Sequence, residues 1–334
     1  MKEARFYQRE GKEHGYIRCM LCPHRCTISP GQYGLCRVRK NEGGTLYAAA
    51  YDRVVSANMD PVEKKPLYHF LPGSNILSVG TTGCNLRCLF CQNWEISQAG
   101  IGDVAAETMT PQAVLRVARE YSSVGVAYTY NEPLINYEWV KDTASLMREQ
   151  GFKNVLVTNG YINPEPWQEL LPLIDAANID VKSFRESFYK NHCGARLEPV
   201  LEAVALMVKN KKHVEITTLL IPSQNDSVRE IEELTDWLAG LDADIPLHFS
   251  RYFPQYKMNF EPTDMDVLLR SCAIAKKKLR YVYLGNVNDP AHSVTRCPAC
   301  DAVLITREGY HANIEHLKDG ICQQCGKRTN IVQH

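Results

Sequence analysis

The sequence predicts an α/β fold in which parallel strands alternate with crossover helices, wound as an open or closed barrel, with small cysteine-rich modules at both ends. Two observations predict it. Between about residues 75 and 290, short apolar or β-branched runs alternate with amphipathic stretches of helical spacing. Most of the 13 cysteines fall into three tight clusters, and two of these clusters flank the central region.

Each predicted element rests on its own pattern. The expected strands are the apolar or β-branched runs at 76–81, 125–130, 154–158, 178–182, 213–221, 246–251 and 281–285. The expected helices cover about 110–121, 136–150, 164–174, 198–211, 227–240 and 263–279. The first helix has Thr110 as its N-cap and Pro111 at its first position, and Val114 and Val117 share one face. Because active sites of such barrels lie at the carboxyl ends of the strands, polar residues that follow these runs are the candidates.

Length and charge limit the possible functions. The chain has 334 residues and a mass of 37.9 kDa, which suits one large domain with appendages, or two to three domains. We expect an N-terminal module and lead-in at 1–72, a barrel at 73–292 and a C-terminal module at 293–334. A net charge of +0 argues against a broadly basic nucleic-acid surface or a polybasic membrane patch. No run of about 18 apolar residues and no signal-peptide core occur, so we expect a cytoplasmic protein.

Cys84, Cys88 and Cys91 form the most informative motif, with C-x3-C-x2-C spacing. Three thiolates on one tight loop can bind three irons of a 4Fe–4S cluster and leave the fourth iron open for a substrate or cofactor. Phe90, just before the last cysteine, would shield the cluster from water. The alternative is a zinc loop completed by a distant ligand.

This triad, with its aromatic residue, resembles the signature of the radical S-adenosylmethionine (SAM) superfamily. The resemblance implies a partial (β/α)6-type radical SAM barrel and SAM as a cofactor. It further implies that the open iron chelates the amino and carboxylate groups of SAM, and that an electron from the cluster cleaves SAM to a 5′-deoxyadenosyl radical.

Strand-end residues are the expected cofactor-binding set, and no further catalytic residue is assigned. Members of the family often carry Gly-Gly-Glu-Pro after the second strand, where backbone and acid bind the SAM ammonium group; here Tyr130 and Asn131 replace the glycines before Glu132. Thr158 and Asn159 resemble a Thr-Asn-Gly of the activating-enzyme branch.

The fourth strand places Asp180 and Lys182 on one face. They would be costly to bury unless paired with each other or satisfied by a ligand, with Asp180 toward the ribose and Lys182 toward the SAM carboxylate. Glu215 and Thr217 on the fifth strand and His248 on the sixth complete the expected set.

The two outer cysteine clusters are expected metal sites. Cys297, Cys300, Cys322 and Cys325 form two C-x2-C pairs of the kind found in zinc ribbons, although rubredoxin-type iron uses the same geometry. The N-terminal cluster holds either zinc, which we favour, or a second 4Fe–4S cluster that relays electrons. Its members are Cys19, Cys22, Cys26 and Cys36.

The segments at 60–70, 91–98 and 130–133 resemble a subgroup related to pyruvate formate-lyase activating enzyme, the AmmeMemoRadiSam system radical SAM enzymes. That resemblance implies an AMMECR-domain protein and a Memo-like protein as partners, and an electron donor such as flavodoxin or ferredoxin. The expected function is hydrogen abstraction from a glycyl or other residue of a protein or peptide substrate. Radical chemistry on a small molecule and a non-catalytic Fe–S or zinc scaffold are the alternatives.

Overall fold

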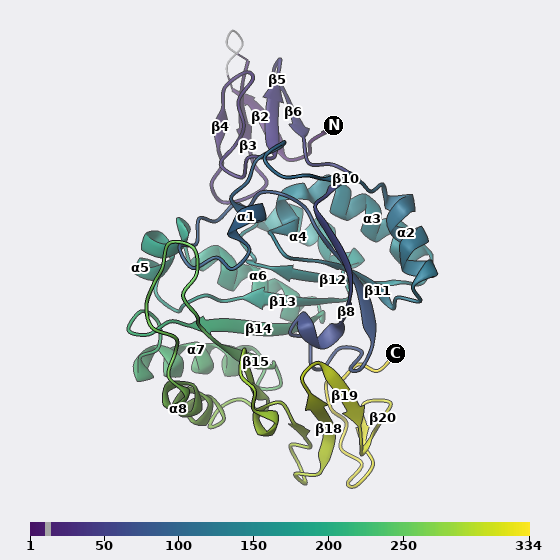
Figure 1. Cartoon of the computed structure of the whole chain (residues 1–334), viewed down its shortest axis with the longest axis vertical. Helices are drawn as coiled ribbons and strands as arrows, with labels where there is room; N and C mark the ends of the chain where they lie inside the picture. Colours follow the sequence, from purple (N-terminus) through teal and green to yellow (C-terminus); the bar gives the residue numbers. More distant parts are fainter. Residues whose placement is uncertain (11–14) are drawn as a thin grey trace.

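An eight-stranded sheet forms the frame of the molecule (Figure 1). The computed structural model describes residues 1–10 and 15–334. The strands, in the spatial order β16-β15-β14-β13-β12-β11-β9-β8, are all parallel except β8, which pairs antiparallel with β9 at one edge. Their bounds are β8 (Ser56–Pro61), β9 (Asn75–Gly80), β11 (Gly125–Tyr128), β12 (Lys153–Thr158), β13 (Ala176–Asp180), β14 (His213–Leu220), β15 (Leu247–Arg251) and β16 (Val282–Gly285).

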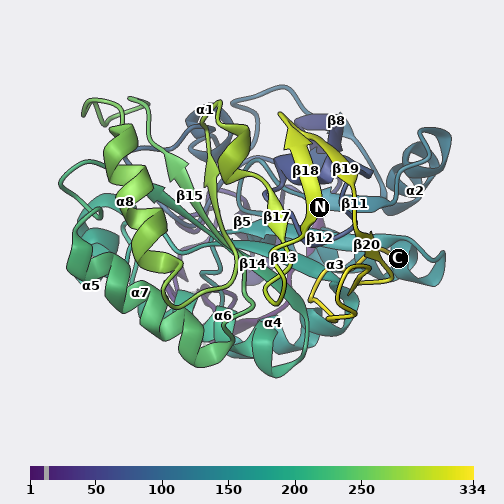
Figure 2. The same ribbon diagram turned by 90° about the horizontal axis from the view of Figure 1, so that it is seen from below.

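Crossover helices connect successive parallel strands, and Figure 2 shows several of them in an arc along the outer rim of the sheet. They are α2 (Pro111–Glu120), α3 (Tyr137–Glu149), α4 (Pro164–Leu170), α6 (Glu198–Lys209), α7 (Val228–Leu241) and α8 (Met265–Ala275). The hydroxyl of Thr110 caps α2 by accepting a hydrogen bond from the Ala113 N–H at 3.2 Å. The predicted α/β fold with a parallel sheet is thus confirmed. Within the described residues, no helix is both long and apolar enough to cross a membrane.

Shorter elements lie in the connections. They are α1 (Trp94–Ser97), α5 (Glu186–Phe188), η1 (Val62–Lys64), η2 (Pro133–Asn136), η3 (Leu171–Leu173), η4 (Tyr189–Cys193) and η5 (Pro290–His292). The layer between sheet and helices is apolar, and Trp167 on α4 is fully buried in it, its indole N–H donating to the carbonyl of Ala203 at 3.1 Å. The polar residues that line the site lie at the carboxyl ends of the strands instead.

The N-terminal module consists of small antiparallel sheets that project from one end of the molecule (Figure 1). Its strands are β1 (Lys2–Glu3), β2 (Tyr7–Glu10), β3 (Tyr16–Cys19), β4 (Thr27–Ile28), β5 (Arg39–Glu42) and β6 (Thr45–Ala48), and β7 (Arg53–Val54) pairs with β10 (Glu107–Thr108) nearby. Arg39 on β5 pairs with Glu138 on α3 at 3.0 Å, and both side chains are buried. This ion pair anchors the module to the barrel, because a buried charge is stable only beside its partner.

The C-terminal module is a small ribbon at the opposite end (Figure 1). Its strands are β17 (Thr295–Arg296), β18 (Val303–Glu308), β19 (His311–Ile314), β20 (Leu317–Lys318) and β21 (Ile321–Cys322). The chain then returns to the barrel, where the Leu71 N–H donates to the carbonyl of Val332 at 2.7 Å and Asn330 contacts the His69 ring at 2.6 Å. The module is therefore bonded to the segment that precedes β9.

Candidate active site

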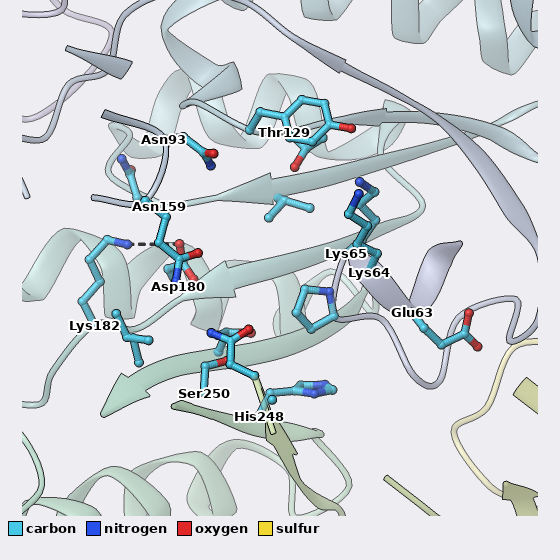
Figure 3. Close-up of a pocket in the computed structure, with 18 of the residues that line it drawn as sticks. Glu63, Lys64, Lys65, Asn93, Thr129, Asn159, Asp180, Lys182, His248 and Ser250 are labelled. Atoms are coloured by element: carbon cyan, nitrogen blue, oxygen red, sulfur yellow. Dashed lines mark hydrogen bonds and ion pairs between the residues drawn. The ribbon is translucent and has the colours of Figure 1, made fainter. Parts of the chain in front are cut away.

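A cavity of about 840 Å³ opens at the carboxyl ends of the parallel strands. The loops after β9, β11, β12 and β13 form one side, and η1 with the β18–β19 turn forms the other. Figure 3 shows Asp180, Lys182 and Asn159 on one side, with Lys64, Lys65 and Glu63 across from them. This volume lies in the range of pockets that hold cofactor-sized ligands.

The three-cysteine loop lies at one end of this cavity. Cys84, Cys88 and Cys91 all line it, together with the buried ring of Phe90. The loop is tight: Gly83 has φ +85°, and a Cβ added there would lie 2.4 Å from the carbonyl oxygen of Cys36. A larger residue at this position would push the cysteine loop away from the N-terminal module.

The triad sulfurs are not gathered as ligands of one ion would be. Among the described residues, only the four C-terminal cysteines form a set of three or more whose ligand atoms all lie within 4.8 Å of one another. Cys84, Cys88 and Cys91 form no such set, and thiolates that bind different irons of one cluster do not need to. The sulfur of Cys84 accepts a hydrogen bond from the Leu86 N–H at 3.3 Å, and that of Cys91 lies 3.1 Å from the hydroxyl of Ser97.

Glu132 is a buried acid at the floor of the cavity. Its carboxylate accepts hydrogen bonds from the Thr158 hydroxyl at 2.7 Å, the Leu134 N–H at 3.0 Å and the Asn159 N–H at 2.8 Å. Burial raises the pKa of Glu132 to about 7. Asn159 in turn donates to Asn85 at 2.9 Å, next to Cys84. Glu132 therefore fixes the loop after β12 against the cysteine loop.

Asn131 and Tyr130 contact neighbouring loops with their side chains. The amide of Asn131 donates to the carbonyl of Gly83 at 2.8 Å and accepts from the Thr81 N–H at 3.0 Å. The hydroxyl of Tyr130 donates to Asp60 on β8 at 2.6 Å, and burial raises the pKa of Tyr130 to about 12. Both residues line the cavity, but their polar atoms bind protein groups.

Asp180, Thr217 and His248 lie side by side across three neighbouring strands, because Asp180 is in register with Thr217, and Thr217 with His248. Asp180 pairs with Lys182 at 3.0 Å (Figure 3), with side-chain exposures of 35% and 16%. The hydroxyl of Thr217 is buried and has no hydrogen-bond partner among the described residues. Thr217 lines the cavity, so this unpartnered hydroxyl is a candidate contact for a bound molecule.

Glu215 lies outside the cavity, unlike the other nine residues of the expected cofactor-binding set. Its carboxylate accepts from the backbone N–H groups of Tyr68 and His69, at 3.0 and 2.7 Å. It also contacts the rings of His213 at 3.0 Å and His248 at 2.7 Å. A cofactor contact by Glu215 stays a prediction, and these four bonds argue against it.

The sequence reasoning missed the part of the cavity wall that the C-terminal module supplies. Arg307 is fully buried and lines the cavity with Tyr310. Its guanidinium donates to the carbonyl of Tyr68 at 2.7 Å and lies 4.1 Å from the centre of that ring. The sequence did contain a signal for this. Arg307 lies two residues after the buried Ile305, so both side chains are on the same face of the strand. An arginine on a buried face needs buried hydrogen-bond acceptors.

The outer cysteine clusters differ in geometry. In the C-terminal set, Cys297 and Cys325 have sulfurs 3.6 Å apart, and Cys300 and Cys322 have sulfurs 3.8 Å apart. Tetrahedral zinc with bonds of about 2.3 Å requires sulfur separations of about 3.8 Å, so this set fits one ion. None of its cysteines lines the large cavity. The N-terminal set lines a second, small cavity and is not compact in this way; its members are Cys19, Cys22, Cys26 and Cys36.

Comparisons with known proteins agree with this arrangement. A profile of the radical SAM superfamily matches residues 78–238. The uncharacterized protein MJ0808 of Methanocaldococcus jannaschii is 42% identical over 338 residues, which cover 99% of this chain and 100% of that protein. Pyruvate formate-lyase 1-activating enzyme of Escherichia coli K12 is 26% identical over 162 residues, covering 46% of this chain and 65% of that enzyme.

A solved structure shares the fold alone: Streptococcus suis SuiB superposes with a TM-score of 0.50 at 16% identity, over 65% of this chain and 48% of that chain. The superfamily match covers the cysteine triad and the strand-end residues through Thr217. The alternative of a non-catalytic scaffold is therefore wrong. This chain belongs to the radical SAM superfamily, is related to the pyruvate formate-lyase activating enzymes, and is an enzyme.

Proposed function

We propose that this enzyme binds a 4Fe–4S cluster through Cys84, Cys88 and Cys91, cleaves SAM in the large cavity, and abstracts hydrogen from a protein or peptide substrate. The observation that carries the proposal is the position of the three cysteines at one end of an 840 Å³ cavity, beside a paired acid and base and a free hydroxyl. When bound, the cluster supplies the electron that cleaves SAM.

The cavity residues have separable roles in this proposal. Asp180 and Lys182, which pair at 3.0 Å, would exchange part of that contact for the ribose hydroxyls and the carboxylate of SAM. The unpartnered hydroxyl of Thr217 supplies a further contact beside Asp180. Glu132 and Asn159 hold the loops that carry these groups, and Glu132 keeps an acid near the position of the SAM ammonium group. His248 is held by Glu215, so its ring is fixed in orientation.

A protein substrate is supported by the related activating enzyme, whose name identifies pyruvate formate-lyase as its target. The cavity also extends beyond the SAM-contacting residues to Lys64, Lys65 and Tyr310, which leaves a region for a second molecule. By the same family resemblance we include AMMECR-domain and Memo-like partners and a flavodoxin or ferredoxin as electron donor. The cytoplasmic location is proposed from the sequence pattern alone.

Anaerobic reconstitution tests the cluster and the chemistry. We expect the reduced protein to convert SAM to 5′-deoxyadenosine, measured by chromatography. The Cys88→Ala variant should lose both the visible absorbance of the cluster and this product. Cys272→Ala is the matched control, because Cys272 is buried on α8 outside all three clusters. Continued SAM cleavage by Cys88→Ala would refute the assignment.

Hydrogen transfer distinguishes the substrate classes. The enzyme is incubated with SAM and an extract from cells grown in deuterated medium, separated into macromolecular and low-mass fractions. We expect 5′-deoxyadenosine to gain deuterium with the macromolecular fraction only. Gain of deuterium with the low-mass fraction would refute a protein substrate and support the small-molecule alternative.

A further inference from the structure

The N-terminal cysteines form a closed four-thiol site beside the active site. Cys19 ends β3, Cys22 and Cys26 lie on the turn between β3 and β4, and Cys36 precedes β5. The Cys19 N–H donates to the carbonyl of Cys26 at 2.9 Å, which holds the two ends of the turn together. Apolar side chains close the small cavity between the four sulfurs; they are Leu21, Ile28, Leu35 and Ile135. All four cysteines are free thiols, so a metal site is available.

The spacing of these sulfurs decides between the two metals. A single zinc ion needs thiolates about 3.8 Å apart, which the C-terminal set shows with 3.6 and 3.8 Å. No three of the N-terminal sulfurs all lie within 4.8 Å of one another, and in this they match the radical SAM triad within the described part of the chain. We infer that Cys19, Cys22, Cys26 and Cys36 bind a second 4Fe–4S cluster, in place of the zinc that the sequence favours.

Arg39 supplies an independent observation. It is 1% exposed and lines the small cavity, and its two terminal nitrogens are bound to Glu138 and to the carbonyl of Arg5. Its Nε has no hydrogen-bond partner among the described residues. A buried, unpartnered N–H beside four thiols matches the hydrogen bonds that protein groups donate to cluster sulfurs.

This second site touches the radical SAM loop. The ring of His24, between Cys22 and Cys26, lies 2.7 Å from the carbonyl oxygen of Asn85, and Asn85 itself lines the small cavity. Its neighbour Cys84 lines the large cavity. The carbonyl of Cys36 packs against Gly83, where no side chain would fit. Two clusters held here would be separated only by these packed residues.

The position suggests a direction for electrons. Leu35, beside Cys36, is 53% exposed, and the module projects from the barrel (Figure 1). A low-potential one-electron carrier protein would give one electron to the N-terminal cluster, which passes it to the cluster on the triad; no bond forms or breaks and no proton moves. This relay role rests on the proposed function, whereas the metal content of the site does not.

The test removes the triad and leaves the N-terminal module intact. The full-length Cys84→Ala/Cys88→Ala/Cys91→Ala protein is purified anaerobically from iron-replete cells, and its iron and zinc are counted. We expect about four irons per chain, half the content of the unmodified protein, and a 4Fe–4S paramagnetic resonance signal after reduction that SAM does not change. A protein with no iron and about two zinc ions would overturn the inference.

A second measurement tests electron transfer through the N-terminal cluster. Its outcome can be distinguished from a failure of the proposed function. In the Cys22→Ser/Cys26→Ser protein, we expect reduction of the triad cluster by flavodoxin to slow at least tenfold, while reduction by dithionite is unchanged. Circular dichroism shows whether this protein is folded, and Cys272→Ser is its control. Equal rates with flavodoxin would overturn the relay. Failure of the unmodified protein to cleave SAM would instead refute the proposed function.

Discussion

Replacement of Glu215 by Gln is the sharpest test of how the site is supported. The carboxylate is fully buried and binds four donors: two backbone N–H groups, of Tyr68 and His69, and the rings of His213 and His248. A glutamine amide keeps the shape but has one acceptor oxygen and one NH₂ group. The histidine rings can change tautomer and accept, but the backbone N–H groups cannot. At least one backbone donor therefore loses its acceptor.

The expected cost follows from these contacts. An unsatisfied buried donor costs about 1–3 kcal/mol, and loss of the charge-assisted bonds brings the total for Glu215→Gln to about 3–5 kcal/mol. For a chain of this size, the melting temperature should fall on the order of 10 °C. Glu233→Gln is the control, because Glu233 is a surface residue paired with arginines, and its replacement should barely change the melting temperature.

The effect should also depend on pH. Burial alone would raise the pKa of Glu215, but the hydrogen bonds from His213 and His248 hold it well below its ordinary value of 4.5. Because its pKa is lowered in the folded protein, the ionised Glu215 carboxylate stabilises the fold above about pH 4.5. This stabilisation is lost as the pH falls through the pKa that Glu215 has in the folded state. The difference in melting temperature between the unmodified protein and Glu215→Gln should therefore become smaller in acid. A fall of less than about 2 °C at pH 7.5, or an intact fold that has lost SAM affinity, would refute the structural role.

Three further predictions concern the cavity and the ribbon. Asp180→Asn should weaken SAM binding about tenfold by calorimetry with the melting temperature unchanged, since Asp180 is partly exposed and its pair with Lys182 is not a fold determinant; unaltered affinity would favour a purely structural ion pair. Cys300→Ala should remove about one zinc per chain and retain the iron, because its sulfur lies 3.8 Å from that of Cys322 in the C-terminal set; loss of iron instead would count against a zinc ribbon. Burial raises the pKa of Glu132 from 4.5 to about 7. The contribution of this residue to the stability of the folded protein is therefore fully present below pH 4.5 and is lost as the pH rises through 7. Relative to Glu132→Gln, the unmodified protein should lose about 3 kcal/mol of unfolding free energy between pH 4.5 and 8 in urea titrations, and parallel pH profiles would contradict this.

The sequence allowed the sheet, its helices and most of the site to be predicted, because these depend on local patterns. Strand periodicity places Asp180 and Lys182 at a strand end, and parallel register then brings Asp180 beside Thr217 and His248. Glu215 shares the face of Thr217 by the same alternation, yet the segment before β9 supplies donors that occupy its carboxylate. The alternation of residues along one strand cannot predict a contact between Glu215 and a segment almost 150 residues earlier in the chain.

The kind of metal site that we infer for the N-terminal module could not be predicted from the sequence, for a related reason. The spacing of Cys19, Cys22, Cys26 and Cys36 fixes which thiols meet but leaves their separation open, and the separation distinguishes a single ion from a cluster. Arg307 is the converse case. Its strand position indicated a buried guanidinium, but only the fold shows that the acceptors are the Tyr68 carbonyl and neighbouring groups.

The contribution of Arg307 and Tyr310 to the cavity wall affects the order in which the enzyme is completed during synthesis. A ribosome makes the cysteine loop about two hundred residues before the β18–β19 turn, which at 5–20 residues per second is roughly 10–40 s. During that interval the loop of Cys84 and Cys91 lies on a nascent barrel whose far wall is still missing. If the triad binds a cluster as proposed, that cluster could therefore be assembled before the β18–β19 turn completes the wall of the cavity.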